Sequence, residues 1–291
     1  MRIAVTGKQG QVVSALLERG PAAGVDIVAV GRPELDLVDR NAIRTVLSQI
    51  RPDAIVSAAA YTAVDKAESE EALAFAINAE GATAIAESAS ELGVPVVHLS
   101  TDYVFPGDKQ GVYLETDAAG PISAYGRSKL AGEFGVAAAN SDHVILRTSW
   151  VYSPFGANFL KTMLRLAETR DRLNVVADQH GTPTSALDIA DAVITIVKRL
   201  SVDPDPKLRG VFHLTGSGEA TWADFAEAIF AAMLTKSGKA VSVGRITTAE
   251  YPTPARRPAN SLLSNEKLKQ SYGIVLPDWR VSAKVVLDRL I

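Results

Sequence analysis

The fold is decided by the stretch MRIAVTGKQGQVVSALLERG, residues 1–20. Residues 3–6 form a short apolar run, Gly7 and Gly10 follow it, and residues 11–19 have a helical pattern. A strand, a glycine-bearing turn and a helix in this order begin a right-handed βαβ unit. Backbone N–H groups at such a turn can approach a phosphate at the helix N-terminus. Two glycines at this spacing also occur in ordinary strand-to-helix turns, so the pattern needs support from the rest of the chain.

The same alternation continues through the first half of the chain. Strands are predicted at residues 3–6, 26–30, 54–57, 96–100 and 144–147, and helices at 11–19, 40–50, 70–92, 124–138 and 158–170. The strands are apolar nearly throughout, which is typical of strands covered on both faces. We therefore expect an α/β fold with a Rossmann-type doubly wound parallel sheet.

The pattern loosens after about residue 150. Strands are predicted at residues 173–176, 211–214 and 241–246, and helices at 187–200, 222–234 and 281–290. Proline-containing loops are expected around residues 204–206 and at 251–258. We interpret residues 1–150 as an NAD(P)-binding domain. Residues 151–291 are interpreted as a smaller mixed α/β domain, mostly for substrate and partly interleaved with the first.

Composition excludes several classes of protein. The formal net charge is -3, and no basic cluster exceeds a pair such as Arg256-Arg257, so a nucleic-acid partner is not expected. The chain has no cysteine and its four histidines are scattered, so no disulfide or zinc site is expected. It has no apolar run of about 18 residues and no signal-peptide pattern. We expect a cytoplasmic protein without a membrane partner.

The first two strands carry candidate cofactor contacts. Gly7, Gly10, Gln11 and Val12 would surround a pyrophosphate, although Val13 occupies the usual third glycine position and would keep the helix from lying closest to the strand. The second strand ends at Gly31-Arg32, without the acidic residue that holds the ribose hydroxyls of NAD. Arg32 can instead pair with a 2′-phosphate, or it can be a solvated loop arginine. We favour NADPH, with NADH also accepted, and expect Asp36 and Leu37 to border the adenine.

A tyrosine and a lysine form the first candidate catalytic pair. Tyr125 and Lys129 lie four residues apart at the start of a predicted helix, which puts both on one face. A phenol has a pKa near 10 and is a poor acid at neutral pH unless its anion is stabilised, and a neighbouring ammonium does this. The same ammonium can hold a nicotinamide ribose. A surface Tyr/Lys pair would have the same spacing.

Thr101 completes the candidate catalytic set. It follows the predicted strand at residues 96–100, where open α/β sheets place their ligands. Its hydroxyl can donate a hydrogen bond to a carbonyl oxygen that gains negative charge as hydride arrives. A strand-ending Ser/Thr turn is the alternative, but the turn glycines, Tyr125 and Lys129 on one Rossmann frame favour catalysis.

Seven motifs together resemble a known family. They are GKQGQV (7–12), AAAYTAVDKAE (58–68), STDYVF (100–105), YGRSK (125–129), RTSWVY (147–152), DQHGTPT (178–184) and RPANS (257–261). The chain resembles the extended short-chain dehydrogenases/reductases, and among them the dTDP-4-dehydrorhamnose reductase family. The resemblance covers essentially the whole chain.

The resemblance implies a reaction and roles for particular residues. NAD(P)H would deliver hydride to C4 of dTDP-4-dehydro-L-rhamnose, and Tyr125 would protonate the oxygen to give dTDP-L-rhamnose. Lys129 would bind the cofactor ribose, and further cofactor contacts would come from Ala60, Tyr61, Thr62 and Leu99. Thr101 and Asp102 would contact the sugar. Trp150 would lie over it, unless it is a core tryptophan. Arg257 would bind the diphosphate, unless it is a solvated charge beside Arg256.

Some questions stay open at the level of sequence. Relatives that look like magnesium-bridged dimers use acidic residues where this chain has Ala15 and Leu187, so Mg²⁺ and the choice between monomer and homodimer are undecided. Two other functions are compatible with the fold. One is a reductase or epimerase of another nucleotide sugar, and the other is a non-catalytic regulatory subunit.

Overall fold

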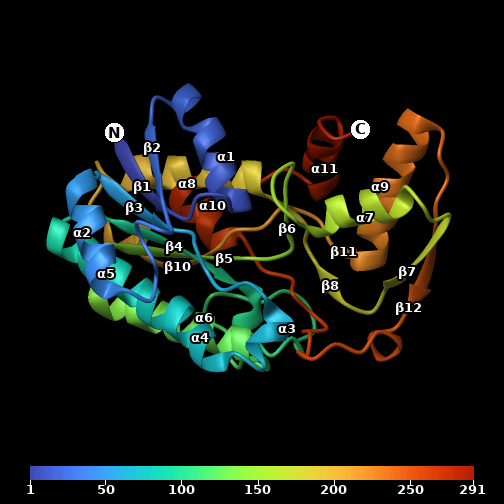
Figure 1. The fold of residues 1–291 in the computed structure, drawn as a ribbon, viewed down its shortest axis with the longest axis horizontal. Coiled ribbons are helices and arrows are strands. Elements are labelled where there is room, and N and C mark those ends of the chain that lie inside the picture. The colour runs from blue at the N-terminus through green and yellow to red at the C-terminus, as the bar shows by residue number, and fades with distance from the viewer.

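A six-stranded parallel sheet forms the centre of the computed structural model, which describes residues 1–291 (Figure 1). Its strand order is β10-β5-β4-β3-β1-β2. The strands are β1 (Arg2–Thr6), β2 (Asp26–Val30), β3 (Ala54–Ser57), β4 (Val96–Thr101), β5 (His143–Thr148) and β10 (Gly210–His213). Because the chain adds β2 on one side of β1 and β3 on the other, the strand order reverses at β1, where such sheets bind ligands.

Helices cover both faces of this sheet (Figure 1). α1 (Gln11–Arg19) and α8 (Ala186–Leu200) pack together on one face, and α2 (Arg40–Ile50), α5 (Ala82–Leu92) and α6 (Ala124–Ala139) cover the other. Successive residues of a strand point to opposite faces. Accordingly, Ile3 joins the apolar core beneath α1 and α8, while Ala4 joins the core beneath α2 and α5. The predicted doubly wound α/β fold is confirmed.

The predicted helix at residues 70–92 differs from the structure in its middle. The segment begins as α4 (Glu71–Phe75), widens into a π-helical turn at Ala76–Gly81 and continues as α5. α3 (Val64–Ala67) precedes it. Asn78 lies on the inner side of this wide turn. Asn78 is 1% exposed, and its side-chain amide is hydrogen-bonded through both its oxygen and its nitrogen. Apolar periodicity cannot predict such a turn, because its cause is a polar contact to another segment.

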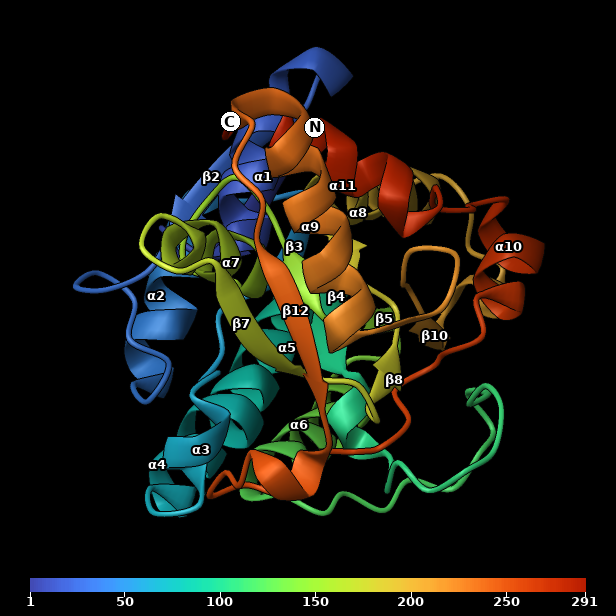
Figure 2. The ribbon, with the colours of Figure 1, turned by 90° about the vertical axis from the view of Figure 1, so that its right-hand side faces the viewer.

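The second half of the chain supplies several small sheets and further helices (Figure 2). The two-stranded pairs are β7 (Arg172–Val176) with β12 (Ser242–Ile246), β8 (His180–Gly181) with β11 (Ala220–Thr221), and β6 (Val151–Tyr152) with β9 (Thr184–Ser185). The helices are α7 (Phe159–Ala167), α9 (Trp222–Ser237), α10 (Glu266–Tyr272) and α11 (Trp279–Leu287). Single 3₁₀ turns lie at Pro21–Ala23, Asp102–Val104, Pro206–Leu208 and Thr248–Glu250.

One strand of the second half belongs to the large sheet, and one of its helices covers a face of that sheet. β10 pairs with β5, and α8 packs on α1. Figure 1 shows α7, α9, α11 and the short strands gathered beside one end of the sheet, whereas α10 packs against β10. The division of the chain at residue 150 stays a prediction. No helix is both long enough and apolar enough to cross a membrane.

Candidate active site

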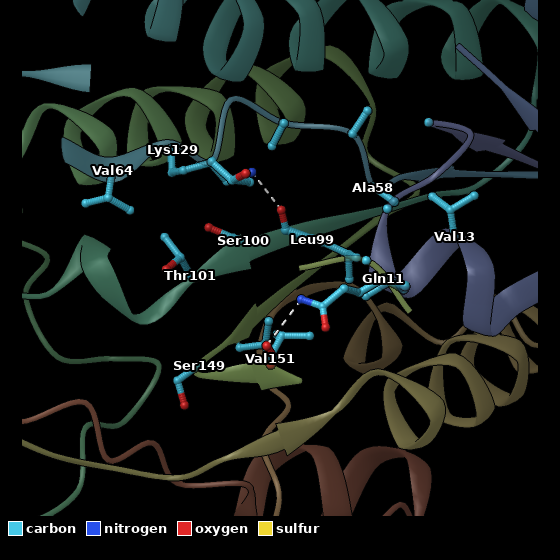
Figure 3. Close-up of a pocket in the computed structure, with 18 of the residues that line it drawn as sticks. Gln11, Val13, Ala58, Val64, Leu99, Ser100, Thr101, Lys129, Ser149 and Val151 are labelled. Carbon is cyan, nitrogen blue, oxygen red and sulfur yellow. Dashed lines mark hydrogen bonds between the residues drawn. The ribbon is translucent and has the colours of Figure 1, made fainter. Parts of the chain in front are cut away.

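A cavity of about 570 Å³ opens at the carboxyl ends of the sheet strands (Figure 3). Its walls are the segments that follow β1, β3, β4 and β5, together with the first turns of α1 and α6. Twelve of the predicted site residues line it: Gly7, Gly10, Gln11, Val12, Ala60, Thr62, Leu99, Thr101, Asp102, Tyr125, Lys129 and Trp150. Parallel strands end at one edge of a sheet, and this brings together residues far apart in the sequence.

The turn after β1 has the properties of a pyrophosphate cradle. Gly7 has a φ of +105°, and a Cβ atom at this position would lie 3.1 Å from Val13 Cγ2, so the turn requires glycine there. Gly10 caps α1 without any side-chain hydrogen bond. The first N–H groups of α1 therefore have no side-chain acceptor from the cap and lie at the positive end of the helix dipole. These residues fit the pyrophosphate of a dinucleotide.

Gln11 anchors the first turn of α1 to the second half of the chain. Its Nε2 donates to the Val151 carbonyl at 3.3 Å (Figure 3). Its Oε1 accepts hydrogen bonds from Ser153 Oγ at 2.8 Å and from Asn158 Nδ2 at 3.0 Å. Gln11 thus fixes how the cradle meets the segment after β5.

Thr101 and Asp102 end β4 in a buried hydrogen-bond network. Thr101 Oγ1 donates to Asp102 Oδ1 at 3.0 Å, and Ser261 Oγ donates to Asp102 Oδ2 at 2.5 Å. Asp102 is 4% exposed. Burial raises the pKa of its carboxyl to about 6, although the hydrogen bonds from Ser261 and Thr101 oppose the rise. Ser261 was not singled out as a site residue from the sequence, because a serine about 160 residues away carries no local signal.

Tyr125 lies in the first turn of α6. Ser123 caps this helix by accepting a hydrogen bond from the Gly126 N–H at 3.1 Å. The Tyr103 ring packs edge-on against Tyr125, with centroids 5.6 Å apart. Burial raises the pKa of Tyr125 above its usual value, and the nearby Asp102 carboxylate adds to the rise, whereas the Thr101 hydroxyl opposes it. The phenol is therefore held in its protonated form.

Lys129 lies one turn further along α6, with its side chain beneath the cavity. It is 2% exposed, and its Nζ donates to the Leu99 carbonyl at 2.7 Å (Figure 3). Nζ also lies 3.2 Å from His98 Nε2. Burial lowers the pKa of Lys129 to about 8, although Glu133 on the same helix opposes this. His98 was not singled out as a site residue from the sequence.

The wall after β3 is held in place by two buried polar side chains. Thr6 Oγ1 accepts hydrogen bonds from the N–H groups of Ala58 and Ala59. Asn78 clamps Tyr61, accepting from its N–H at 2.8 Å and donating to its carbonyl at 3.1 Å. The Asn78 amide also donates to Ser128 Oγ on α6 at 3.0 Å. Asn78 thereby fixes the backbone between Ala60 and Thr62 against the helix that carries Tyr125.

Trp150 forms a flat wall of the cavity. Its indole stacks on Trp222, with centroids 3.7 Å apart and planes 12° from parallel. Its φ is +49°, unusual for a bulky residue. Gly181 passes so close that a Cβ there would lie 2.5 Å from the indole ring. Trp150 is half-buried: it packs against the core and also lines the cavity, and its contact with a sugar stays a prediction.

Five predicted site residues do not line the cavity. Arg32 is exposed just beyond β2, and Asp36 accepts a hydrogen bond from the Val38 N–H. Leu37 belongs to the core beneath α2 and α5. The Tyr61 hydroxyl donates a hydrogen bond to the Glu70 carboxylate. Arg257 pairs with Asp65 at 2.7 Å and is therefore not a solvated charge, and the roles assigned to all five stay predictions.

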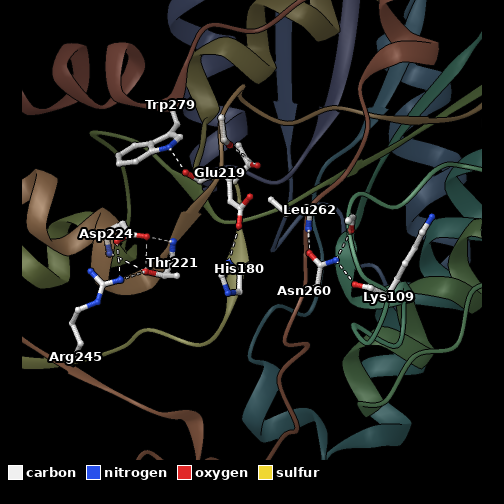
Figure 4. A network of polar contacts seen from close by, with 12 residues as sticks. Lys109, His180, Glu219, Thr221, Asp224, Arg245, Asn260, Leu262 and Trp279 are labelled. Carbon is white, nitrogen blue, oxygen red and sulfur yellow. Dashed lines mark hydrogen bonds and ion pairs between the residues drawn. The ribbon is translucent and has the colours of Figure 1, made fainter.

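Residues 255–261, which we call the strap, connect the second half of the chain to the cavity rim. The strap contacts α3 through Arg257 and Asp65, and it contacts the end of β4 through Ser261 and Asp102. Asn260 Nδ2 donates to the carbonyls of Lys109 and Gly111 at 2.7 and 2.6 Å (Figure 4). The strap thereby covers the loop that follows β4. No group of three or more His, Asp or Glu side chains is arranged to hold a metal ion.

The fold and the cavity define a class of protein. A doubly wound parallel sheet with a glycine turn at its switch point, and a Tyr-x-x-x-Lys pair with a threonine at one cavity, are the features of a short-chain dehydrogenase/reductase. Residues 1–291 match the family described as the RmlD substrate binding domain, and the chain belongs to this family. The family resemblance expected from the sequence is confirmed.

Individual relatives agree with this assignment. The dTDP-4-dehydrorhamnose reductase of Sinorhizobium fredii is 57% identical over 98% of this chain and 96% of its own. A crystal structure of a dTDP-4-dehydrorhamnose reductase from Clostridium acetobutylicum is 38% identical, covers 100% of this chain and 99% of its own, and superposes with a TM-score of 0.93. The Bacillus anthracis enzyme of the same name, in complex with NADP, is 34% identical, covers 99% of each chain and has a TM-score of 0.91.

Proposed function

We propose that this protein reduces dTDP-4-dehydro-L-rhamnose to dTDP-L-rhamnose with NADPH, in the biosynthesis of dTDP-rhamnose. The observation that carries the proposal is the convergence of Thr101, Tyr125 and Lys129 on one cavity that continues into the glycine cradle. The names of the relatives, matched over nearly the full length of each chain, support the choice of substrate.

Each polar group at the cavity has a task in this reaction. The cofactor, when bound, supplies a hydride to C4 of the sugar. Tyr125, kept protonated by its surroundings, donates its proton to the oxygen at C4. The Thr101 hydroxyl, which donates to Asp102 in the structure, would turn to donate its hydrogen bond to the same oxygen. The Lys129 ammonium stabilises the phenolate that results, and it holds the nicotinamide ribose. Tyr125 then recovers a proton from solvent.

The cofactor and the sugar would occupy different parts of the cavity. Gly7, Gly10, Gln11 and Val12 would hold the pyrophosphate, while Ala60 to Thr62 and Leu99 would border the rest of the cofactor. Trp150 gives the sugar a flat apolar wall, and Asp102 can accept hydrogen bonds from its hydroxyls. The NADP complex of the Bacillus anthracis relative and the lack of an acidic residue at Gly31-Arg32, where β2 ends, favour NADPH, with NADH also accepted.

A comparison of keto-sugars tests the proposed substrate. Purified protein is mixed with NADPH, and then with NADH, in the presence of dTDP-4-dehydro-L-rhamnose, and the nicotinamide absorbance is followed. Parallel reactions contain the corresponding UDP- and GDP-keto-sugars. We expect the highest kcat/KM with the dTDP sugar. A higher kcat/KM with the UDP- or GDP-linked keto-sugar would assign that compound as the substrate. Binding of the cofactor without turnover of any of the sugars would indicate a regulatory subunit.

A further inference from the structure

A buried polar row lies beneath the cavity and ends at Lys129. Ser57 and His98 are paired residues of the neighbouring strands β3 and β4. His98 Nδ1 lies 3.0 Å from Ser57 Oγ, and His98 Nε2 lies 3.2 Å from Lys129 Nζ. Ser57 and His98 are each 1% exposed. We call these three residues the Ser57–His98–Lys129 row.

The pairing of β3 with β4 and the packing of α6 on β4 bring the row together. Alternation along β4 turns His98 and Ser100 toward α6, and Lys129 and Glu133 lie one helical turn apart on that helix. His98 therefore meets Lys129, while Ser100 donates a hydrogen bond to Glu133. Val96, on the same face of β4, is apolar and buried. A polar row at such a place is costly to bury unless its members are hydrogen-bonded to one another.

The donors and acceptors of the row fix the state of the imidazole. A lysine ammonium has donors only, so His98 Nε2 must accept from it. Nδ1 then carries the hydrogen and donates to Ser57 Oγ. Burial, aided by the Lys129 charge, lowers the pKa of His98 well below its usual value, which keeps the ring neutral. Of the three Lys129 donors, one is taken by the Leu99 carbonyl and one by His98, which leaves the third for a group in the cavity.

We propose that His98 is a positioning residue, which as a neutral Nδ1–H imidazole holds the Lys129 ammonium charged and aimed at the cofactor ribose. The inference rests on the proposed role of Lys129. Without an acceptor at Nε2, the buried ammonium would lose one of its two protein acceptors, and its neutral form would be favoured. Lys129 would then be uncharged over more of the neutral pH range.

Other charges near the row are few. Glu133 acts on Lys129 from the same helix, and it is paired with Arg147 of β5 at 2.6 Å. Asp102, at the end of β4, acts on Tyr125 of α6. The π turn contributes the buried, neutral Asn78, whereas its Glu80 is exposed, and β3 contributes only the Ser57 hydroxyl. Charged side chains of α3, α4 and α5 lie at the surface or are only half-buried: Asp65, Lys66, Glu71, Glu87 and Glu91. In the structure, His98 is the only side chain that accepts a hydrogen bond from the ammonium, and the Leu99 carbonyl is its backbone acceptor.

The test measures Lys129 directly in the protein without substrate. NMR signals of ¹³C-labelled lysine side chains are followed from about pH 6 to about pH 10, with Lys129 assigned through Lys129→Arg. In His98→Leu we expect the pKa of Lys129 to fall by about one unit, the shift expected when a charged group loses one hydrogen bond. The dissociation constant of NADPH, from fluorescence titration, should rise about tenfold near pH 8 and less near pH 6.

Two further variants separate positioning from packing. His98→Gln places an amide oxygen near the position of Nε2, and it should restore both the lysine titration and NADPH binding. His213→Leu removes another fully buried histidine, whose ring nitrogens make no hydrogen bond to a side chain, and it should change neither readout. Long-range ¹⁵N NMR of the unmodified protein gives a measurement that needs no variant. It should show His98 as the neutral Nδ1–H tautomer.

The outcomes are distinct. Two results would overturn the proposal. One is an Nε2–H tautomer of His98 at a pH below the pKa of Lys129, and the other is an unchanged pKa of Lys129 in a folded His98→Leu protein. These measurements involve no turnover. The reductase assay could therefore fail while the NMR measurements give the expected tautomer of His98 and the expected change in the pKa of Lys129. That result would count against the proposed function but would support the role of His98 toward Lys129.

Discussion

Tyr125 is the residue on which the proposed chemistry depends most. Its surroundings raise the pKa of the phenol, so it stays protonated at neutral pH and is present as a proton donor. Release of this proton then requires a cation, the Lys129 ammonium, to stabilise the phenolate. The sequence could predict the Tyr125–Lys129 pair because its spacing follows from helix geometry. It could not predict Ser261, His98 or Asn78, because each contacts the site through the tertiary fold.

Replacing Tyr125 by phenylalanine tests its role as proton donor. Tyr125→Phe keeps the ring that packs on Tyr103 but removes the acid, so we expect kcat to fall on the order of 100-fold. NADPH affinity should stay nearly unchanged. Tyr272→Phe, which removes the hydroxyl of a tyrosine that does not line the cavity, is the control. Near-normal turnover by Tyr125→Phe would mean that another group protonates the sugar.

Asp102 should make stability depend on pH. Its pKa is raised from 3.8 to about 6 in the folded protein, so between these values the folded chain binds a proton that the unfolded chain does not. The free energy of unfolding therefore falls as pH rises through this window, by about 2 kcal/mol. Urea unfolding from pH 4 to pH 7 should show this slope, and Asp102→Asn should lack it. Parallel curves for the two proteins would contradict the assignment.

Arg32 should discriminate between the two cofactors. It is exposed beyond β2, so Arg32→Ala should leave the fold unchanged. If its guanidinium binds the 2′-phosphate, the substitution should raise the dissociation constant of NADPH about tenfold and leave that of NADH unchanged. Arg44→Ala removes another exposed arginine, from α2, and serves as control. An equal effect on both cofactors would show that Arg32 does not bind the phosphate.

At the scale of elements, most of the sheet and its helices could be predicted. The β-branched runs and the helical periodicity placed β1, β2 and α2 at their observed positions, because burial on both faces imposes these patterns. The short strands β6, β8, β9 and β11 could not be found, since two-residue pairings carry no periodicity. α9 extends to Ser237 because Gly238, with a φ of +73°, ends it. The π turn could not be predicted, because it depends on what Asn78 contacts.

The π turn provides a prediction of its own. Asn78→Ala would leave the N–H and carbonyl of Tyr61 without partners, and it should lower the free energy of unfolding by about 2 kcal/mol. It should also lower kcat, because the wall between Ala60 and Thr62 would lose its anchor. Urea unfolding and steady-state kinetics measure the two effects. Asn41→Ala, at an exposed position of α2, should change neither. If Asn78→Ala were as stable and as active as the unmodified protein, the π turn would have no role in holding the wall of the cavity.

At the scale of the whole molecule, two connections join the second half of the chain to the elements around the cavity. Gln11 binds the first helix to residues 151–158, and the strap binds α3 and the end of β4. The sequence indicated that the two halves interleave, but not through which contacts, since these join residues up to 192 positions apart. Substrate would be held between parts that come from both halves of the chain.

Arg257 tests whether the strap also binds substrate. Arg257→Met and Asp65→Asn each break the same ion pair, so a purely structural pair predicts similar losses of stability and similar changes in KM. If Arg257 binds the diphosphate, Arg257→Met should raise KM about tenfold, whereas Asp65→Asn, which leaves the guanidinium in place, should change it little. Equal KM values for the two variants would show that Arg257 only stabilises the fold and does not bind the diphosphate.

The central claim is hydride transfer from a nicotinamide to C4 of a dTDP-linked keto-sugar, and an isotope experiment tests it most directly. The protein is incubated with dTDP-4-dehydro-L-rhamnose and NADPH that carries deuterium at both C4 positions of the reduced ring, and the sugar product is examined by NMR and mass spectrometry. We expect dTDP-L-rhamnose with one deuterium atom, bound at C4 of the sugar. An unlabelled product, or no product from protein that binds the cofactor, would contradict the claim.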